Sequence, residues 1–313
     1  MKKIRIGYCG RGKWEKFRWS EFVDYARTKN VIVDEIDLTK PIENQGEFDL
    51  IIHKMTYLMH GHDMNCDPEL NRIYNYIKNH PEIIFVDDLD AVAVTLDREE
   101  TDTLLKSINW NLSEKVGIPN SSHINKSDIN SIKTATSNLQ FPILAKPKIA
   151  SSTSNSSTEE SHMLRLATTP EQLVNFPAPA ILQEYKNHGG VVYKVYTLGS
   201  KIECDLRPST RDILPGETFN LDFHSQKPNE NSEIWTQPRD LSHIKIPFEH
   251  LEKISSVLRK EMKMDCLGFD VLIDENEKFW IIDVNYFPGY KNIIDLWPKF
   301  LNFFLEKLGM PPR

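Results

Sequence analysis

Two runs near the C-terminus, Gly268-Phe-Asp-Val-Leu-Ile273 and Trp280-Ile-Ile-Asp-Val-Asn-Tyr-Phe-Pro-Gly-Tyr290, decide how the whole chain is interpreted. Each is apolar enough for a buried strand, yet the first contains Asp270 and the second contains Asp283 and Asn285. Residues two apart on a strand project from one face, so Asp283 and Asn285 should lie side by side. A carboxylate in apolar surroundings needs a hydrogen bond or a cation, and Mg²⁺ prefers carboxylate, amide and phosphate oxygens. We therefore predict that Asp270, Asp283 and Asn285 bind Mg²⁺; the alternative is that Asp283 and Asn285 merely open the turn before the Pro-Gly pair.

A second pattern, upstream, suits nucleotide binding. The strand predicted over residues 141–146 ends on Lys146, a single cation placed to neutralise phosphate groups. The run Ile181-Leu-Gln-Glu-Tyr185 passes from apolar to polar residues, as does a hinge whose backbone N–H and C=O groups read the edge of adenine in an apolar slot. Taken singly, Lys146 also fits an ordinary strand-end lysine, and the second run fits a simple strand end.

The N-terminal part has the pattern of a parallel α/β layer, because apolar runs typical of strands alternate with amphipathic segments typical of helices. Strands are predicted at 3–9, 31–37, 49–55 and 83–86. Helices are predicted at 14–28, at 68–80, and from the pair Asp87-Asp88, as a cap, to about Leu96. We place the first domain boundary after this last helix.

The remainder of the chain is rich in predicted strands. These are expected at 141–146, 180–184, 191–198, 201–207, 267–273 and 279–284, and helices at 247–263 and 292–308. The pair Gly199-Ser200 predicts a tight hairpin. The run Ser151-Ser-Thr-Ser-Asn-Ser-Ser-Thr158 predicts a mobile loop, and the Gly-, Pro- and Asn-rich stretch 212–231 predicts a long exposed loop.

Composition excludes several classes of protein. The chain has 313 residues, 40% of them hydrophobic, which is enough for two or three domains. With 45 acidic and 38 basic residues the formal net charge is -7, so an anionic ligand must meet a local cluster of cations. The four cysteines form no C-x-x-C pair, and no segment has the pattern of a signal peptide or membrane span. We expect a monomeric cytoplasmic protein whose partner is a small molecule rather than nucleic acid or membrane.

These motifs resemble those of the ATP-grasp fold, and within it most closely those of the inositol trisphosphate 5/6-kinase family. The resemblance covers nearly the whole chain. It rests on Ile143-Leu-Ala-Lys-Pro147, Gln183-Glu-Tyr185, Gly268-Phe-Asp270 and Asp283-Val-Asn-Tyr-Phe-Pro-Gly-Tyr290, and also on Arg5-Ile-Gly-Tyr8, Ile51-Ile-His-Lys54, Thr95-Leu-Asp-Arg98, Ser161-His162, Asn187-His188, Tyr193-Lys-Val195 and Arg207-Pro-Ser209. It implies an α/β (α+β) chain with an N-terminal parallel α/β substrate-side domain at 1–96. Two ATP-grasp subdomains would follow, at 97–190 and 191–313, with the nucleotide between them and the metal site in the second.

The resemblance also implies an activity and a set of site residues. The activity is a Mg²⁺- and ATP-dependent inositol polyphosphate kinase that phosphorylates inositol 1,3,4-trisphosphate at the 5 or 6 position, with inositol tetrakisphosphate 1-kinase, phosphatase or isomerase activity as further expectations. The implied ATP-site residues are Arg98, Lys146, Gln183, Glu184, Tyr185 and Ser209, and the implied metal ligands are Asp270, Asp283 and Asn285. The implied contacts to the inositol phosphate are Lys54, His162, Lys194, Asn285 and Gly289. Lys13 and Arg11 lie near the family's N-terminal substrate lysine, although the local sequence departs from the family pattern there.

Phosphoryl transfer requires mainly positioning and charge neutralisation. ATP beside a trisphosphate puts two polyanions in one cleft, and each phosphate–cation contact at 4 Å is worth on the order of 4 kcal/mol gross at an effective dielectric near 20. We predict Lys194, Arg207 and His162 as catalytic residues, with the guanidinium of Arg207 steadying the transferred phosphoryl oxygens. The alternatives are a surface arginine before a proline and a solvated histidine. No general base is assigned, since a loose transition state makes one less necessary.

Two other functions share part of this pattern. An ATP-grasp ligase that activates a carboxylate as an acyl phosphate would have similar ATP and magnesium residues, but it has no need to gather Lys54, His162, Lys194 and Arg207. A non-catalytic inositol-phosphate-binding protein would have no use for a metal clamp on the γ-phosphate, so Asp270, Asp283 and Asn285 argue against it.

Overall fold

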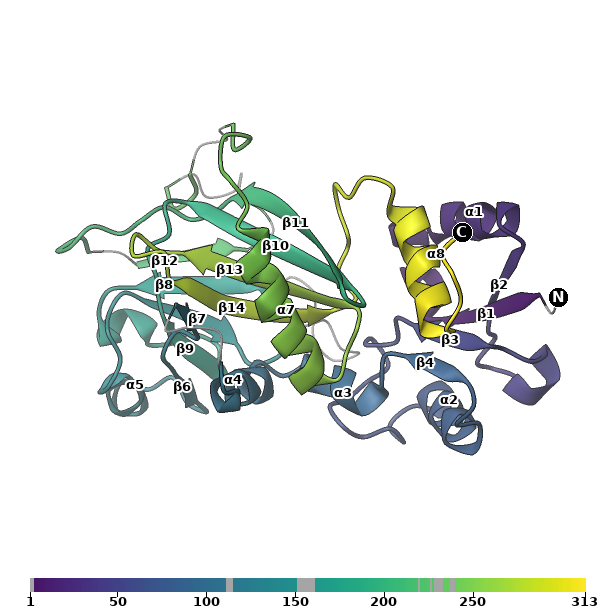
Figure 1. The fold of residues 1–313 in the computed structure, drawn as a ribbon. Helices are drawn as coiled ribbons and strands as arrows, with labels where there is room; N and C mark the ends of the chain where they lie inside the picture. Colours follow the sequence, from purple (N-terminus) through teal and green to yellow (C-terminus); the bar gives the residue numbers. More distant parts are fainter. Residues whose placement is uncertain are drawn as a thin grey trace.

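The computed structural model describes residues 3–110, 115–150, 161–218, 220–225, 227, 233–236 and 240–313. The described chain builds three sheets, one of four strands and two of five (Figure 1). The four-stranded sheet lies at one end of the molecule, and the two five-stranded sheets lie together at the other. The loop predicted at 151–158 falls outside the described residues.

The four-stranded sheet comes from the N-terminal part, and all its strands run parallel, as predicted. In spatial order the strands are β2 (Val31–Glu35), β1 (Ile4–Cys9), β3 (Leu50–His53) and β4 (Ile84–Val86). The helices between them are α1 (Trp19–Thr28) and α2 (Pro68–Asn79), and α3 (Leu89–Val94) follows β4. Asp88 caps α3 by accepting from the N–H of Ala91 at 3.1 Å, whereas Asp87 has a different role described below.

The helix predicted from residue 14 begins only at Trp19. Residues 14–18 form a short 3-10 turn, Glu15–Phe17, that ends on Arg18 with a left-handed φ of 55°, a conformation that cannot continue an α-helix. Trp14 is buried and its indole N–H donates to the carbonyl of Cys9 at 3.0 Å. The aromatic side chain therefore anchors the entry to α1 instead of forming its first turn.

The last helix, α8 (Leu296–Lys307), returns to the N-terminal sheet and packs beside α1 (Figure 1). Trp19 of α1 and Phe300 and Phe304 of α8 are buried, with the ring centroid of Trp19 5.7 Å from that of Phe300. The helix was predicted from residue 292, but Asn292 and Asp295 both have left-handed φ angles, so it starts four residues later.

The second sheet carries the two decisive runs. Its strands, in spatial order, are β11 (Lys201–Pro208), β10 (Val191–Leu198), β13 (Leu267–Ile273), β14 (Phe279–Tyr286) and β5 (Val116–Gly117), and α7 (Phe248–Met262) packs against it (Figure 1). The pairing of Leu198 with Lys201 confirms the predicted hairpin at Gly199-Ser200. Strand β14 was predicted to end at residue 284 but continues to Tyr286, so Asp283 and Asn285 are strand residues and do not open a turn.

The third sheet is antiparallel throughout. Its strands, in spatial order, are β12 (Asn220–His224), β8 (Met163–Ala167), β7 (Ile143–Pro147), β9 (Ala180–Glu184) and β6 (Ser121–Ile124), and the helices on this side are α4 (Arg98–Ser107) and α5 (Ile129–Thr136). Strand β12 corrects the prediction of a continuous loop over 212–231. Phe223 is buried in it, and Arg165 of β8 forms a two-pronged ion pair with Asp222 at 2.6 and 2.7 Å.

Asp87 joins the N-terminal sheet to the second sheet. Its side chain is buried, and its two oxygens accept from the backbone N–H groups of Asp265 and Cys266 at 2.9 and 2.8 Å. Burial raises the pKa of Asp87 to about 7, against the opposing effect of these two hydrogen bonds.

The domain boundaries at 96 and 190 remain predictions. In the described part of the chain, no helix has the length and apolar content needed to cross a membrane.

Candidate active site

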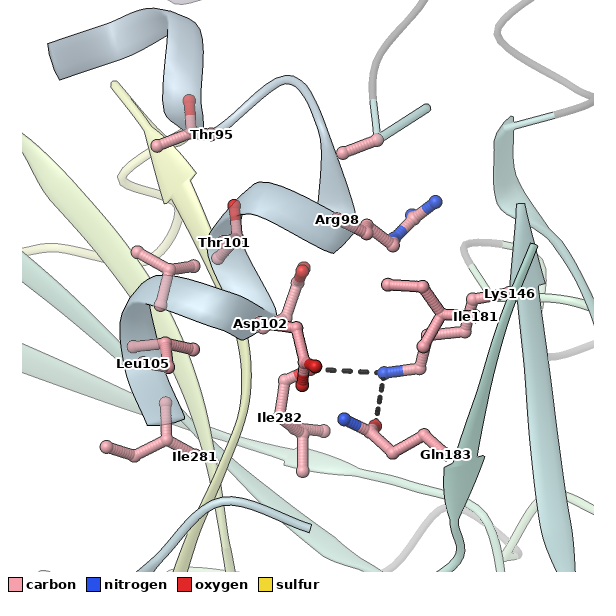
Figure 2. A pocket seen from close by; sticks show the side chains of 13 residues that line it. Thr95, Arg98, Thr101, Asp102, Leu105, Lys146, Ile181, Gln183, Ile281 and Ile282 are labelled. Carbon is pink, nitrogen blue, oxygen red and sulfur yellow. Dashed lines mark hydrogen bonds between the residues drawn. The ribbon is translucent and has the colours of Figure 1, made fainter. Parts of the chain in front are cut away.

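A cavity lies between the second and third sheets and is closed on one side by α4 (Figure 2). Its volume is about 30 Å³, room for about two water molecules, so the walls must separate to admit a larger ligand. The lining residues are Thr95, Arg98, Thr101, Asp102, Leu105, Lys146, Ala150, Ile181, Gln183, Ile281, Ile282, Asp283 and Val284. Apolar walls with a few converging polar groups are typical of a site for a cofactor or small molecule.

Lys146 reaches into this cavity from β7. Its side chain is buried, and its ammonium donates to Oε1 of Gln183 at 2.7 Å and to the carbonyl of Ile282 at 3.1 Å (Figure 2). Burial lowers the pKa of Lys146 to about 8, although the nearby carboxylate of Asp283 acts in the opposite direction. Lys146 is therefore a cavity residue and not a solvated lysine at a strand end.

Arg98 begins α4 and holds the neighbouring backbone. Its guanidinium donates to the carbonyls of Pro147 at 2.7 Å, Ile149 at 3.0 Å and Ser161 at 3.2 Å. Burial lowers the pKa of Arg98, and the charge of Asp283 opposes that shift. The structure thus brings two predicted ATP-site cations, Arg98 and Lys146, to the same carboxylate.

Of the residues predicted for the hinge, only Gln183 turns its side chain into the cavity. The carboxylate of Glu184 points to the other face of β9, where it accepts from the amide of Asn120 at 3.1 Å and the backbone N–H of Gln140 at 2.9 Å. The hydroxyl of Tyr185 donates to the carbonyl of Arg211 at 2.6 Å. At these two positions, contact with a ligand would be left to the backbone.

Ser209 lies just beyond the end of β11 and does not line the cavity. Its hydroxyl is 2.9 Å from Nε2 of His188, and its backbone N–H donates to Gly190 at 2.9 Å. Ser209 therefore supports the segment that follows the predicted hinge.

The three predicted metal ligands lie together on β13 and β14. Asp270 is directly opposite Asp283 in the strand register, and the amide of Asn285 donates to Asp283 at 2.8 Å. Burial and the charge of Asp283 raise the pKa of Asp270, with Lys194 opposing. For Asp283, burial acts to raise the pKa, but the cations Arg98 and Lys146 outweigh it and hold the pKa below its ordinary value.

Two carboxylates beside an amide oxygen fit Mg²⁺. The charge of Asp283 disfavours the ionised form of Asp270, and a divalent cation would relieve that repulsion. Within the described residues, no three His, Cys, Asp or Glu side chains lie close enough together to hold a metal ion. A metal held here would need further oxygens, such as those of phosphates.

Lys194 and Arg207 extend this cluster over β10 and β11. Lys194 lies opposite Asp270 and forms an ion pair with it. Arg207 donates to Asp205 at 2.7 Å and to the hydroxyl of Tyr196 at 2.9 Å, and its charge acts on Asp270. Arg207 is therefore part of the charged cluster and not an isolated surface arginine.

The N-terminal sheet supplies Lys54 at the end of β3. Its ammonium donates to the carbonyl of Phe287, the residue directly after β14, at 2.9 Å. The same ammonium lies 4.7 Å from the centroid of the Phe287 ring. Burial, and secondarily the charge of Lys13, lowers the pKa of Lys54 to about 8. The structure thus places Lys13 near Lys54, with the Lys13 ammonium 5.3 Å from the ring centroid of Tyr57. The side chain of Arg11 lies outside the described residues.

His162 precedes β8 and is half-buried. Its ring centroid is 5.6 Å from that of His224, and its Nδ1 is 3.5 Å from the hydroxyl of Ser225. Burial lowers the pKa of His162, and the nearby Arg98 adds to that shift. His162 therefore lies in the neighbourhood of a predicted ATP-site residue and is not a fully solvated histidine.

A Cβ added at Gly289 would have room in the described structure, since it would meet the side chain of Lys291 at an ordinary 3.7 Å. Gly268, in the Gly-Phe-Asp run, is more restricted, because a Cβ there would lie 2.7 Å from the ring of Pro288. A glycine at 268 thus lets the Pro-Gly turn pack against β13 next to the metal-ligand cluster.

One wall of the cavity was not predicted from the sequence. Helix α4 contributes Thr101, Asp102 and Leu105 to the lining, yet no helix was predicted there. The signal was present, because Asp97 followed three residues later by Glu100 matches a helix-start pattern, and Asp97 does accept from the backbone N–H of Glu99 at 2.8 Å.

Comparison with known proteins agrees with this geometry. Residues 5–92 match the model of the inositol 1,3,4-trisphosphate 5/6-kinase pre-ATP-grasp domain, and residues 110–306 match that of the inositol 1,3,4-trisphosphate 5/6-kinase ATP-grasp domain. Inositol-tetrakisphosphate 1-kinase of Xenopus laevis is 28% identical over 330 residues, covering 100% of this chain and 81% of the relative. Inositol-tetrakisphosphate 1-kinase 1 of Oryza sativa subsp. indica is 29% identical over 321 residues, with 97% and 85% covered.

Solved structures show the fold. The ATP-grasp ligase PsnB complexed with minimal precursor aligns with a TM-score of 0.59 at 12% identity, covering 98% of this chain and 99% of that one. The D-alanine–D-alanine ligase of Bacillus anthracis complexed with ATP aligns with a TM-score of 0.54 at 12% identity, covering 99% and 93%. The chain therefore has the predicted ATP-grasp fold.

Proposed function

The chain belongs to the inositol 1,3,4-trisphosphate 5/6-kinase family and is an inositol phosphate kinase of the ATP-grasp fold, and from this premise we propose that it transfers the γ-phosphoryl group of ATP to the 5- or 6-hydroxyl of inositol 1,3,4-trisphosphate. The observation that carries the proposal is the convergence of Lys146, Arg98 and Asp283 at the cavity beside Asp270 and Asn285. The names of the relatives support a second acceptor, an inositol tetrakisphosphate phosphorylated at position 1. Reverse transfer to ADP, giving phosphatase or isomerase activity, is part of the same proposal.

In the proposed reaction Asp270, Asp283 and Asn285 would hold Mg²⁺, which would supply positive charge to neutralise the ATP phosphates. Lys146 and Arg98 add positive charge on the nucleotide side. The same carboxylate, that of Asp283, is close enough to act on the pKa of both cations. Its attraction for Lys146 and Arg98 favours their position at the cavity before ATP binds. The protein's part in the reaction is therefore placement and charge neutralisation.

The inositol phosphate is proposed to bind between the N-terminal sheet and β10, where Lys54, Lys13, Lys194 and Arg207 supply cations. Lys194 is paired with Asp270, so this proposed contact to the inositol phosphate is next to a proposed metal ligand. His162 and Gly289 are assigned to the same site by the family resemblance alone. Arg207 would steady the transferred group through its fork of N–H donors.

The proposal includes a monomeric, cytoplasmic enzyme that acts on a small molecule, with neither nucleic acid nor membrane as a partner. Size-exclusion chromatography coupled to light scattering tests whether the enzyme is a monomer. The ATP-grasp ligase alternative is disfavoured by the family match over both parts of the chain, and the non-catalytic alternative by the retained carboxylate pair.

The test is incubation of the enzyme with γ-labelled ATP and a panel of inositol phosphates, with and without added ADP, followed by separation of the positional isomers. We expect label on the 5- or 6-oxygen of the trisphosphate and, with ADP, loss of label from the product. Absence of label from every inositol phosphate, at millimolar Mg²⁺, would refute the proposed activity.

A further inference from the structure

Asp102 is a buried carboxylate in the cavity that the reaction described above does not use. It lies on α4 one turn after Arg98, so the two side chains are on the same face of the helix and both line the cavity (Figure 2). The residue is 6% exposed. It faces Lys146 and Gln183 across the cavity.

The two oxygens of Asp102 have different surroundings. Oδ2 accepts from the hydroxyl of Ser121 at 2.7 Å and pairs with the ammonium of Lys106 at 2.8 Å. Oδ1 is buried, and among the described residues it has no hydrogen-bond partner. A buried acceptor without a donor is costly, and a ligand that enters the cavity with a donor at this point would remove that cost.

The position of Asp102 along the cavity limits which part of a nucleotide it can meet. Arg98 and Asp283 mark the phosphate end, and Lys146 reaches from there to Gln183, because Asp283 acts on its pKa and its ammonium donates to Gln183 at 2.7 Å. Ser121, which holds Asp102, is paired in register with Gln183 at the predicted hinge. A carboxylate among phosphates would repel them, whereas one beside the hinge would meet the base.

We propose that Oδ1 of Asp102 accepts a hydrogen bond from the exocyclic 6-amino group of adenine and makes the enzyme select 6-amino over 6-oxo purine nucleotides. The ammonium of Lys106 and the hydroxyl of Ser121 both contact Oδ2, which leaves Oδ1 available to accept from an amino donor. A 6-oxo group would place a second acceptor against Oδ1 and leave both without a donor, the type of mismatch that polar sites reject most strongly. This inference rests on the proposed use of ATP and names the group that reads its base.

The test compares Asp102→Asn with the unchanged enzyme, using ATP and inosine triphosphate as probes. Nucleotide affinity is measured by calorimetry with Mg²⁺ and without an inositol phosphate. The unchanged enzyme should bind ATP at least about tenfold more tightly than inosine triphosphate. In Asp102→Asn the new amide N–H₂ can donate to a 6-oxo group, so the ATP preference should fall by about tenfold or more.

Two controls make the result specific. Glu99→Gln makes the same charge change on the same helix, but Glu99 pairs with Lys148 outside the cavity. The Glu99→Gln variant should therefore prefer ATP over inosine triphosphate as strongly as the unchanged enzyme does. Because both nucleotides are measured on one preparation, a partly unfolded variant binds less of each and the affinity ratio stays interpretable.

An unchanged ratio in Asp102→Asn, within about twofold, would overturn the inference. So would an effect of Asp102→Asn that is equal for ATP and inosine triphosphate but disappears with 2′-deoxy- or 3′-deoxy-ATP, because Oδ1 would then accept from a ribose hydroxyl. If the predicted selectivity is found but no inositol phosphate is phosphorylated, the proposed function fails while this inference stands.

Discussion

Raising the pH through 8 should lower kcat/KM for the inositol phosphate, because Lys54 then loses its positive charge. Burial and the neighbouring Lys13 lower the pKa of Lys54 from 10.5 to about 8. A lysine is charged below its pKa, so the loss occurs on the alkaline side. The charged fraction falls from about nine-tenths at pH 7 to about one-tenth at pH 9, which predicts a fall in kcat/KM for the inositol phosphate of about tenfold.

The assay is the initial rate against inositol phosphate concentration from pH 6.5 to about 9.5, since kcat/KM reports groups in the form without that substrate. ATP is kept saturating because Lys146 also has a pKa of about 8, and bound phosphates keep it charged. In Lys54→Arg the guanidinium stays charged throughout this range, so the alkaline decline should be lost at some cost in absolute rate. A decline of equal size in Lys54→Arg would refute the reasoning, since the titrating group would then be another one.

Three further changes test separate parts of the structure. Asp283→Asn should lower kcat about 100-fold or more through loss of metal and charge placement while changing the inositol phosphate Kd, measured by calorimetry, less than about threefold; near-normal turnover would remove Asp283 from the metal site. Lys194→Ala should raise the KM for the inositol phosphate about tenfold more than the KM for ATP, and equal increases would count against its placement on the acceptor side. Asp87→Ala should lower the free energy of unfolding in urea by about 2 to 4 kcal/mol because two buried backbone N–H groups lose their acceptor. Asp88→Ala, which removes only a helix cap, should cost about 1 kcal/mol, and equal costs would contradict the bridging role of Asp87.

The parts of the fold predicted from sequence are those with strong local periodicity. The parallel N-terminal layer, the hairpin at Gly199-Ser200 and the strands carrying Asp270 and Asp283 were all identified from apolar patterning. The same patterning placed Asp283 and Asn285 on one face, which their 2.8 Å hydrogen bond confirms. These features depend on neighbours within a few residues, which a sequence displays directly.

The missed parts depend on distant partners. Strand β12 follows a stretch rich in turn residues. Its Asp222 forms an ion pair with Arg165 of β8, which lies 57 residues away in the chain. Asp87 resembled half of a capping pair, but its partners are the backbone N–H groups at 265 and 266. Asp102 carries no motif of its own, and only the folded cavity shows that one of its oxygens lacks a partner among the described residues.

Lys54, the lysine proposed to bind the inositol phosphate, is connected by hydrogen bonds to the strand that carries two of the proposed metal ligands. The Lys54 ammonium donates to the carbonyl of Phe287, and the Tyr286 hydroxyl donates to the carbonyl of His53 at 2.7 Å, so the end of β3 is bound to the end of β14 by two hydrogen bonds. Asn285 immediately precedes this junction. An inositol phosphate held by Lys54 would therefore be placed relative to the metal by the backbone itself. The choice of hydroxyl would then follow from how the remaining phosphates orient the ring against Lys13 and Lys194, since phosphoryl transfer demands alignment more than a strong base.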